Sequence, residues 1–202
     1  MPTLIVPFRG AAGKSRLGLP TPAARAAIAR AMVADVVAAC ASVGATYVVT
    51  PDEVMLANAT VVLDPGGGQG AAVSAGLDAA AATGEPTLFL VVNADLPCVT
   101  PRDLLALAGA VPDRGIALAA AADGTTNALA FASPDLFAPL YGAGSAARFA
   151  ELALTRTVDA PNLIDDVDTI ADLERLEARL GRHTRKALAA VRVGALGTGA
   201  PG

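Results

Sequence analysis

Residues 88–100 read LFLVVNADLPCVT, and this stretch organises the interpretation of the whole chain. Five apolar residues, 88–92, are followed at once by polar residues and Pro97. This pattern is typical of a short strand buried on both faces of a parallel sheet. In open α/β sheets ligands bind beyond the carboxyl ends of the strands, which is where Asp95 is expected to lie. A carboxylate there either holds Mg²⁺ against a phosphate or caps a helix that begins near Pro101.

Strands and helices alternate on either side of this stretch. The apolar runs and their Gly and Pro boundaries predict strands at 3–8, 45–50, 60–64 and 155–158, and helices at 22–42, 71–82, 101–110 and 169–180. Asp123-Gly124 separates two further apolar runs, 115–121 and 127–132, as the turn of a hairpin does. We therefore expect an α/β fold, with a Rossmann-like, mixed and mostly parallel sheet flanked by helices.

The composition limits the classes of function. Of the 202 residues 53% are hydrophobic and 17% charged, but no apolar run approaches the roughly 18 residues of a membrane-spanning helix, so no membrane partner is expected. A formal charge of −4 and 3% aromatic residues argue against nucleic-acid binding. No secretory signal is visible, and Cys40 and Cys98 lie far apart in the sequence. A reducing, cytoplasmic setting is therefore expected.

The domain organisation predicted is a single domain over residues 1–180. From Gly181 the sequence becomes basic and then contains Gly and Pro, so residues 181–202 are expected to form a mobile C-terminal tail with nothing to pack against. The only histidine, His183, lies in this tail, which argues against a Ser-His-Asp triad. A homodimer is one assembly that the sequence allows.

A loop after the first strand, residues 9–16, contains three cations, Arg9, Lys14 and Arg16. It is not a P-loop, because the Walker pattern needs a glycine where Phe8 stands. Backbone amides of a glycine-containing loop together with lysine and arginine side chains suit a triphosphate. The alternative is a basic loop exposed to solvent.

A second charged stretch, Asp165-Asp166-Val167-Asp168-Thr169, precedes the last expected helix. Three carboxylates in four residues repel one another unless a cation lies between them. Asp168 or Thr169 can simply cap the helix. If Asp166 and Asp168 instead converge with Asp95, the set suits one or two Mg²⁺ ions.

Three weaker signals lie elsewhere. The glycine loop 66–70, with Gly68 and Gly70, allows close approach of a base or phosphate, or is only a turn. Thr126 and Asn127 line a pocket or close the hairpin. Gly144 and Ser145 begin a helix, where Ser145 is at least a cap and the neighbouring amides offer an anion site.

Taken together, these motifs resemble those of the guanylyltransferases of deazaflavin coenzyme F-420 biosynthesis, the CofC/FbiD-type family. The matching pieces occur in family order and span most of residues 3–173: Val6-Pro7, Lys14-Ser-Arg-Leu17, Asp95-Leu-Pro97, Thr126-Asn-Ala-Leu129, Gly142…Ser145, and Asp166-Val-Asp-Thr169…Ala171-Asp-Leu173.

The resemblance implies a nucleotide-diphospho-sugar transferase (GT-A-like) fold. It also implies transfer of GMP from GTP to phosphoenolpyruvate or 2-phospho-L-lactate, with release of pyrophosphate. Lys14 and Arg16 would contact the phosphates, and Asp95, Asp166 and Asp168 would hold Mg²⁺. The expected substrate-binding residues are Arg9, Gly68, Gly70, Thr126, Asn127, Gly144 and Ser145.

The chain departs from the family pattern at several positions. Ala120 and Ala121 stand where the family has Asp-Arg, Gln69-Gly70 replaces a Leu-Asn pair, and Phe149 replaces a histidine. These differences leave the acceptor and the choice of base open. The rival interpretations are a molybdenum-cofactor guanylyl- or cytidylyltransferase, a nucleotide-binding module without turnover and, more weakly, a sugar-nucleotide transferase.

Overall fold

A computed structural model describes residues 1–53, 56–85 and 88–197 of the chain. Within these residues one seven-stranded sheet has the order β3-β2-β1-β4-β6-β5-β7. The strands are β1 (Thr3–Pro7), β2 (Ala45–Thr50), β3 (Thr60–Leu63), β4 (Phe89–Val92), β5 (Ile116–Ala120), β6 (Thr126–Phe131) and β7 (Thr155–Thr157).

The sheet is mixed and mostly parallel, as the sequence predicted. β3, β2, β1 and β4 run parallel to one another, whereas β6 pairs antiparallel with both β4 and β5. β5 and β6 form the expected hairpin around Gly124, whose φ of 81° lies in the left-handed region that glycine tolerates. Because β6 is antiparallel, its first residues lie at the same edge of the sheet as the last residues of β1 and β4.

Helices and short 3-10 turns connect the strands. They are η1 (Ala11–Gly13), η2 (Ser15–Leu17), α1 (Pro22–Ala41), α2 (Gln69–Ala82), α3 (Pro101–Gly109), η3 (Pro134–Leu136), α4 (Ser145–Ala150), α5 (Pro161–Ile164), α6 (Ile170–Arg175) and α7 (Arg182–Gly197). Thr21 and Thr100 cap α1 and α3 with their hydroxyls, each just before a proline. Among the described helices, none has the length and apolar character needed to cross a membrane.

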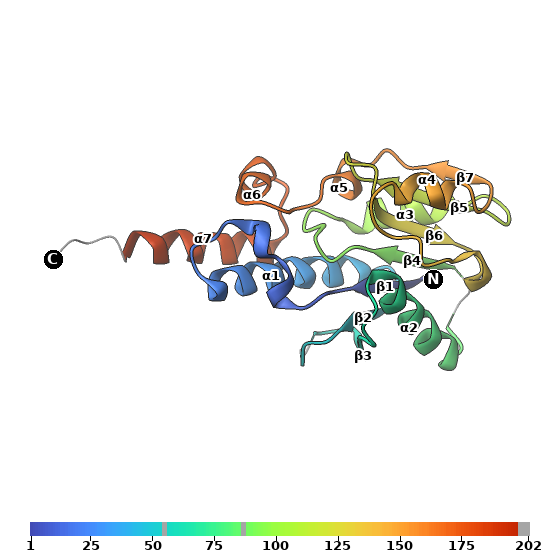
Figure 1. Cartoon of the computed structure of the whole chain (residues 1–202), viewed down its shortest axis with the longest axis horizontal. Helices are drawn as coiled ribbons and strands as arrows, with labels where there is room; N and C mark the ends of the chain where they lie inside the picture. Colours follow the sequence, from blue (N-terminus) through green and yellow to red (C-terminus); the bar gives the residue numbers. More distant parts are fainter. Residues whose placement is uncertain (54–55, 86–87, 198–202) are drawn as a thin grey trace.

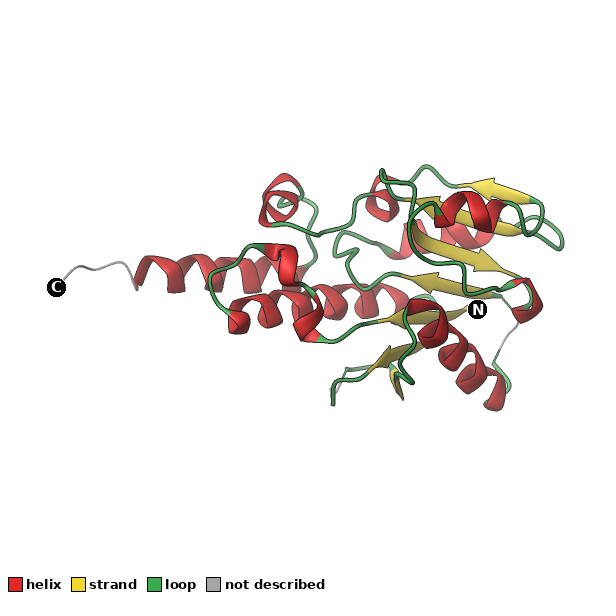
Figure 2. Ribbon diagram, viewed as in Figure 1, coloured by secondary structure: helices red, strands yellow, loops and turns green. Residues whose placement is uncertain are grey.

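Helices cover both faces of the sheet (Figure 2). On one face α1 and α3 pack against alternate strand residues such as Leu4, Val6 and Leu90. On the other face α2 and α4 pack against the residues between them, including Ile5 and Val91. Burial on both faces explains why the strands form continuous apolar runs in the sequence.

The C-terminal segment differs from the expected unpacked tail. Residues 182–197 form α7, which lies along α1 and continues past it (Figure 1). Leu188 is 1% exposed and joins an apolar cluster with Ile28 and Met32 of α1. The prediction was wrong because apolar residues spaced along a basic segment form one buried stripe only when a helix brings them together. Residues 198–202 lie outside the described part of the chain.

Candidate active site

A cavity of about 650 Å³ opens at the carboxyl ends of the parallel strands, where β1 and β4 are neighbours. The chain turns in opposite directions from these two strands, and such a switch point is where α/β sheets bind ligands. The residues that line the cavity are Pro7, Phe8, Arg9, Gly10, Lys14, Arg16, Ala29, Met32, Asp64, Gly68, Gln69, Ala72, Asn93, Ala94, Asp95 and Asp168.

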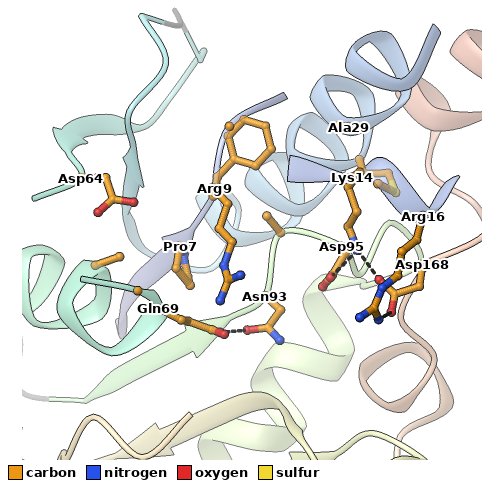
Figure 3. A pocket seen from close by; sticks show the side chains of 16 residues that line it. Pro7, Arg9, Lys14, Arg16, Ala29, Asp64, Gln69, Asn93, Asp95 and Asp168 are labelled. Carbon is orange, nitrogen blue, oxygen red and sulfur yellow. Dashed lines mark hydrogen bonds and ion pairs between the residues drawn. The ribbon is translucent and has the colours of Figure 1, made fainter. Parts of the chain in front are cut away.

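Lys14 joins the two charged stretches that the sequence singled out. Its Nζ donates to Asp95 Oδ2 at 2.8 Å and to Asp168 Oδ1 at 2.7 Å (Figure 3). It also donates to the carbonyl oxygen of Val167 at 2.7 Å. Burial acts to lower the pKa of Lys14, but the charges and hydrogen bonds of the two aspartates outweigh it and raise the pKa above 10.5. The ammonium therefore stays charged at neutral pH.

Asp166 completes a cluster of three carboxylates. One oxygen each of Asp95, Asp166 and Asp168 lies within 4.8 Å of the others. Burial, and then the charge of Asp95, raise the pKa of Asp166 above its usual value of 3.8. Asp95 Oδ1 is buried and has no hydrogen-bond partner among the residues that the structure describes. Carboxylate oxygens are the ligands that Mg²⁺ prefers, and an unpartnered oxygen is available, so the residues fit a bound divalent cation.

The side chain of Asp172 fixes the backbone of the segment that carries Asp166 and Asp168. Asp172 accepts hydrogen bonds from the backbone N–H of Asp168 at 3.2 Å and of Thr169 at 2.9 Å, and Thr169 caps α6. Capping by Thr169 was one alternative for this stretch, and it coexists with the carboxylate cluster. The neighbouring Asp165 instead forms ion pairs with Arg175 and Arg179. Of the three acidic residues in this stretch, Asp166 and Asp168 therefore join the carboxylate cluster, and Asp165 does not.

Amide side chains form a hydrogen-bonded row beside the cavity: Asn127 was expected from the sequence as a binding residue, whereas Gln69 and Asn93 were not. Gln69 Nε2 donates to Asn93 Oδ1 at 2.6 Å, and Asn93 Nδ2 donates to the Thr126 carbonyl oxygen at 3.1 Å. Asn127 Nδ2 donates to Asp166 Oδ1 at 3.4 Å. Asn93 was identifiable in principle, because it precedes Asp95 by two positions on the same strand extension.

The cationic loop after β1 reaches the cavity. Arg9 and Arg16 line it together with Lys14, and Figure 3 shows Arg9 between the aspartate cluster on one side and Asp64 and Gln69 on the other. Arg16 is 81% exposed and lies 3.7 Å from Asp168. Asp52, another residue not singled out from the sequence, fixes the start of this loop because its Oδ2 accepts the Ala11 N–H at 2.8 Å.

Other predicted substrate residues lie outside the lining of this cavity. Ser145 and Thr126 are buried against each other, since Ser145 Oγ accepts the Thr126 N–H at 2.9 Å. Gly68 lines the cavity, whereas Gly70 packs against Pro139: a Cβ at Gly70 would lie 2.9 Å from Pro139 Cα. Gly144, with a φ of 69°, serves as the N-cap of α4.

Phe149, which replaces a family histidine, is also a core residue. Its side chain is fully buried, and its ring lies 5.2 Å from that of Tyr141 and 6.4 Å from that of Phe137. The substitution therefore adds to an aromatic cluster under α4 and places no group in the cavity.

The arrangement is suited to binding a polyphosphate with a metal cation. Three cationic side chains (Arg9, Lys14 and Arg16) and three carboxylates (Asp64, Asp95 and Asp168) line the cavity, so their formal charges cancel. A divalent cation at the aspartates would make the site attractive to phosphate oxygens. No histidine is present among the lining residues, so the site offers positioning and charge neutralisation rather than an imidazole base.

Sequence comparisons support this interpretation. Residues 11–160 match the family described as MobA-like NTP transferase domain. A phosphoenolpyruvate guanylyltransferase of Sphaerobacter thermophilus is 40% identical over 68% of this chain and 72% of its own length. One from Streptomyces coelicolor is 38% identical over 95% of this chain and 96% of its own length. A 3-phospho-D-glycerate guanylyltransferase of Phenylobacterium zucineum is 34% identical, covering 93% of this chain and 95% of its own.

The fold has solved counterparts as well. A crystal structure described as a nucleotide-diphospho-sugar transferase from Desulfovibrio desulfuricans superposes with a TM-score of 0.73 at 18% identity, covering 95% of this chain and 98% of that one. The expected fold type is thereby confirmed. The chain is a nucleotidyltransferase that belongs to the MobA-like NTP transferase family, among the guanylyltransferases of the phosphoenolpyruvate and 2-phospho-L-lactate type.

Proposed function

We propose that this protein transfers GMP from GTP to the phosphate of a three-carbon acid, phosphoenolpyruvate or 2-phospho-L-lactate, and releases pyrophosphate in deazaflavin coenzyme biosynthesis. The observation that carries the proposal is the contact of Lys14 with both Asp95 and Asp168 beside Asp166, at the mouth of a cavity with two further cations. The names of the relatives support GTP as the donor.

The reaction needs little acid–base chemistry from the protein. An oxygen of the acceptor phosphate, already anionic at neutral pH, attacks the α-phosphorus of GTP, the bond to the bridging oxygen breaks, and pyrophosphate leaves. Lys14, Arg16 and Arg9 are proposed to hold the phosphate oxygens and to stabilise the charge that develops on them. Mg²⁺, held by Asp95, Asp166 and Asp168, would supply further charge neutralisation and orient the phosphates.

The identity of the acid is the finer part of the proposal. Phosphoenolpyruvate is favoured because it is named for two of the relatives above, whereas a third is named for 3-phospho-D-glycerate. Ala120 and Ala121 remove the charged pair that the resembling family has before its Gly-Thr-Asn segment. We expect this loss to act on acceptor preference rather than on GTP binding, because neither alanine lines the cavity described above.

The decisive experiment is pyrophosphate release by the purified protein with Mg²⁺, GTP and each acid in turn: phosphoenolpyruvate, 2-phospho-L-lactate and 3-phosphoglycerate. Release with one acid, absent without Mg²⁺ and lost in Asp95→Asn, would establish the reaction and its acceptor. The same assay with CTP and a pterin acceptor tests the molybdenum-cofactor alternative. A protein that binds GTP but releases no pyrophosphate with any acceptor would contradict the proposal and favour a binding module.

A further inference from the structure

The first turn of α7 is held by a carboxylate from the middle of α1. Asp35 is only 6% exposed. Its Oδ1 accepts the backbone N–H of His183 at 2.9 Å, and its Oδ2 accepts that of Thr184 at 2.8 Å. The first N–H groups of a helix have no partner within the helix, and a capping side chain usually supplies one from the adjacent residue. Here the cap lies 148 residues earlier in the chain.

Gly181 makes this close approach feasible and links α7 to the site. Its N–H donates to the carbonyl oxygen of Pro97 at 2.8 Å, two residues after Asp95. A Cβ at position 181 would overlap the Asp35 carboxylate, at 2.6 Å from Oδ2. Any larger residue at position 181 would therefore force the carboxylate off the helix start or push α7 away from α1.

The apolar cluster under α7 supports the three segments that carry Lys14, Asp95 and the Asp166–Asp168 pair. Leu17 comes three positions after Lys14, Cys98 comes three positions after Asp95, and Val167 stands between Asp166 and Asp168. All three are at most 2% exposed, and all three belong to the same cluster as Leu188 of α7. Densely packed interiors transmit small displacements, so the position of α7 affects each of these segments.

The backbone of Val167 joins these segments directly. Its N–H donates to the carbonyl oxygen of Asp95 at 3.0 Å, and its carbonyl oxygen accepts from Lys14 Nζ at 2.7 Å. Its side chain is fully buried in the cluster that α7 completes. A shift of that side chain would therefore move Asp166 and Asp168 relative to Asp95 and Lys14.

We infer that α7, anchored by Asp35 and Gly181, is a positioning element that sets the spacing of the three carboxylates and Lys14. The inference rests on the proposed role of the carboxylates as metal ligands. It assigns a function in the active site to a helix that lies outside residues 11–160, the part that matches the family domain. Asp35, Gly181 and Leu188 are not among the residues that line the cavity, so they act through Val167 and its neighbours.

The test compares Gly181→Ala with Gly109→Ala in the full chain. Gly109 is exposed at the end of α3, and a Cβ there meets no atom within 4 Å, so the same substitution is harmless at that position. Mn²⁺ affinity is measured by electron paramagnetic resonance titration, which does not depend on turnover. We expect Gly181→Ala to weaken Mn²⁺ binding about tenfold, as loss of a supporting partner of a metal ligand typically does, and Gly109→Ala to leave it unchanged.

A second pair of variants distinguishes a loss of Mn²⁺ affinity from a general loss of stability. Leu188→Ala removes a side chain from the cluster, whereas Val193→Ala changes a residue of the same helix that is 70% exposed. Mn²⁺ affinity, kcat and KM are compared for folded protein well below each melting temperature. If Gly181→Ala and Leu188→Ala lower only the melting temperature and keep wild-type Mn²⁺ affinity, α7 is purely structural and the inference is overturned. Wild-type protein that binds Mn²⁺ but releases no pyrophosphate would refute the proposed function alone.

Discussion

Replacing Asp166 with asparagine should stabilise the metal-free protein while abolishing GMP transfer. Asp166 is half-buried, and its burial and the charge of Asp95 raise its pKa. An acid whose pKa rises on folding lowers stability once the pH is high enough to charge it, because the folded state holds that charge less well than the unfolded chain. Asparagine has the same shape and no charge, and it keeps the oxygen that accepts from Asn127.

The increase in the free energy of unfolding expected for Asp166→Asn depends on the distance between the carboxylates. Two unit charges within 4.8 Å repel by about 3 kcal/mol at an effective dielectric constant of about 20. The Lys14 ammonium between Asp95 and Asp168 offsets most of this repulsion. A net gain of about 1 kcal/mol remains, which corresponds to a rise of roughly 2–4 °C in melting temperature for a chain of this size.

The pH dependence gives a second signature. In the wild type, protonated Asp166 favours the folded state at low pH, because its pKa is higher in the folded than in the unfolded chain. This favourable contribution is lost as pH rises from the usual value of 3.8 through the raised pKa of folded Asp166. Thermal unfolding followed by circular dichroism in chelator, at about pH 4 and about pH 7.5, measures it. The variant should exceed the wild type only at the higher pH, and it should gain less stability from added Mg²⁺.

The adjacent Asp165 provides a control of opposite sign. Partial burial acts to raise its pKa, but hydrogen bonds from Arg179 and Arg175 outweigh it and lower the pKa below 3.8. Asp165→Asn should therefore destabilise the protein at neutral pH, by less than about 1 kcal/mol because the pairs are partly exposed. If Asp166→Asn has a lower melting temperature than the wild type in chelator at neutral pH, the charged Asp166 carboxylate does not destabilise the metal-free protein and the prediction is refuted.

Three further variants test other parts of the site. Lys14→Met should lower kcat by about 10²–10³-fold in the pyrophosphate assay, because a preorganised charge is lost. Arg16→Ala should raise the KM for GTP roughly tenfold with little change in melting temperature, since this exposed side chain makes only a 3.7 Å pair with Asp168; an unchanged KM would remove Arg16 from the phosphate site. Ser145→Ala should cost about 1–3 kcal/mol in urea unfolding, because the buried Thr126 N–H loses its acceptor. Equal stability would contradict that role.

Much of the site could be predicted from the sequence because its chemistry is local. A buried strand that ends in Asn-Ala-Asp-Leu-Pro places Asp95 at the ligand edge of the sheet, and both the strand and that position are confirmed. The cationic loop after the first strand reaches the same edge for the same reason. Parallel strands share one direction, so the loops at their carboxyl ends gather at one edge of the sheet.

The sequence was less informative where partners are distant. Thr126 and Ser145 have the residue types of a substrate pocket, but only the tertiary structure shows that their hydrogen bonds are made to each other. The C-terminal segment was expected to be mobile because it is basic and then contains Gly and Pro, with nothing evident to pack against. Its anchor, Asp35, lies in a different helix, where the sequence gives no sign of a cap.

The alternation of strands and helices, the mixed and mostly parallel sheet, and the residue types available to a nucleotide all follow from the amino-acid sequence alone. These features arise from periodicity and turn chemistry within short windows. In contrast, the position of Lys14 between Asp95 and Asp168, and the packing of α7 under the segments that carry them, are visible only in the folded chain. Lys14 is separated from Asp95 by 81 positions in the sequence and from Asp168 by 154. Contacts over such separations depend on how the helices pack on the sheet, and no local pattern encodes that packing.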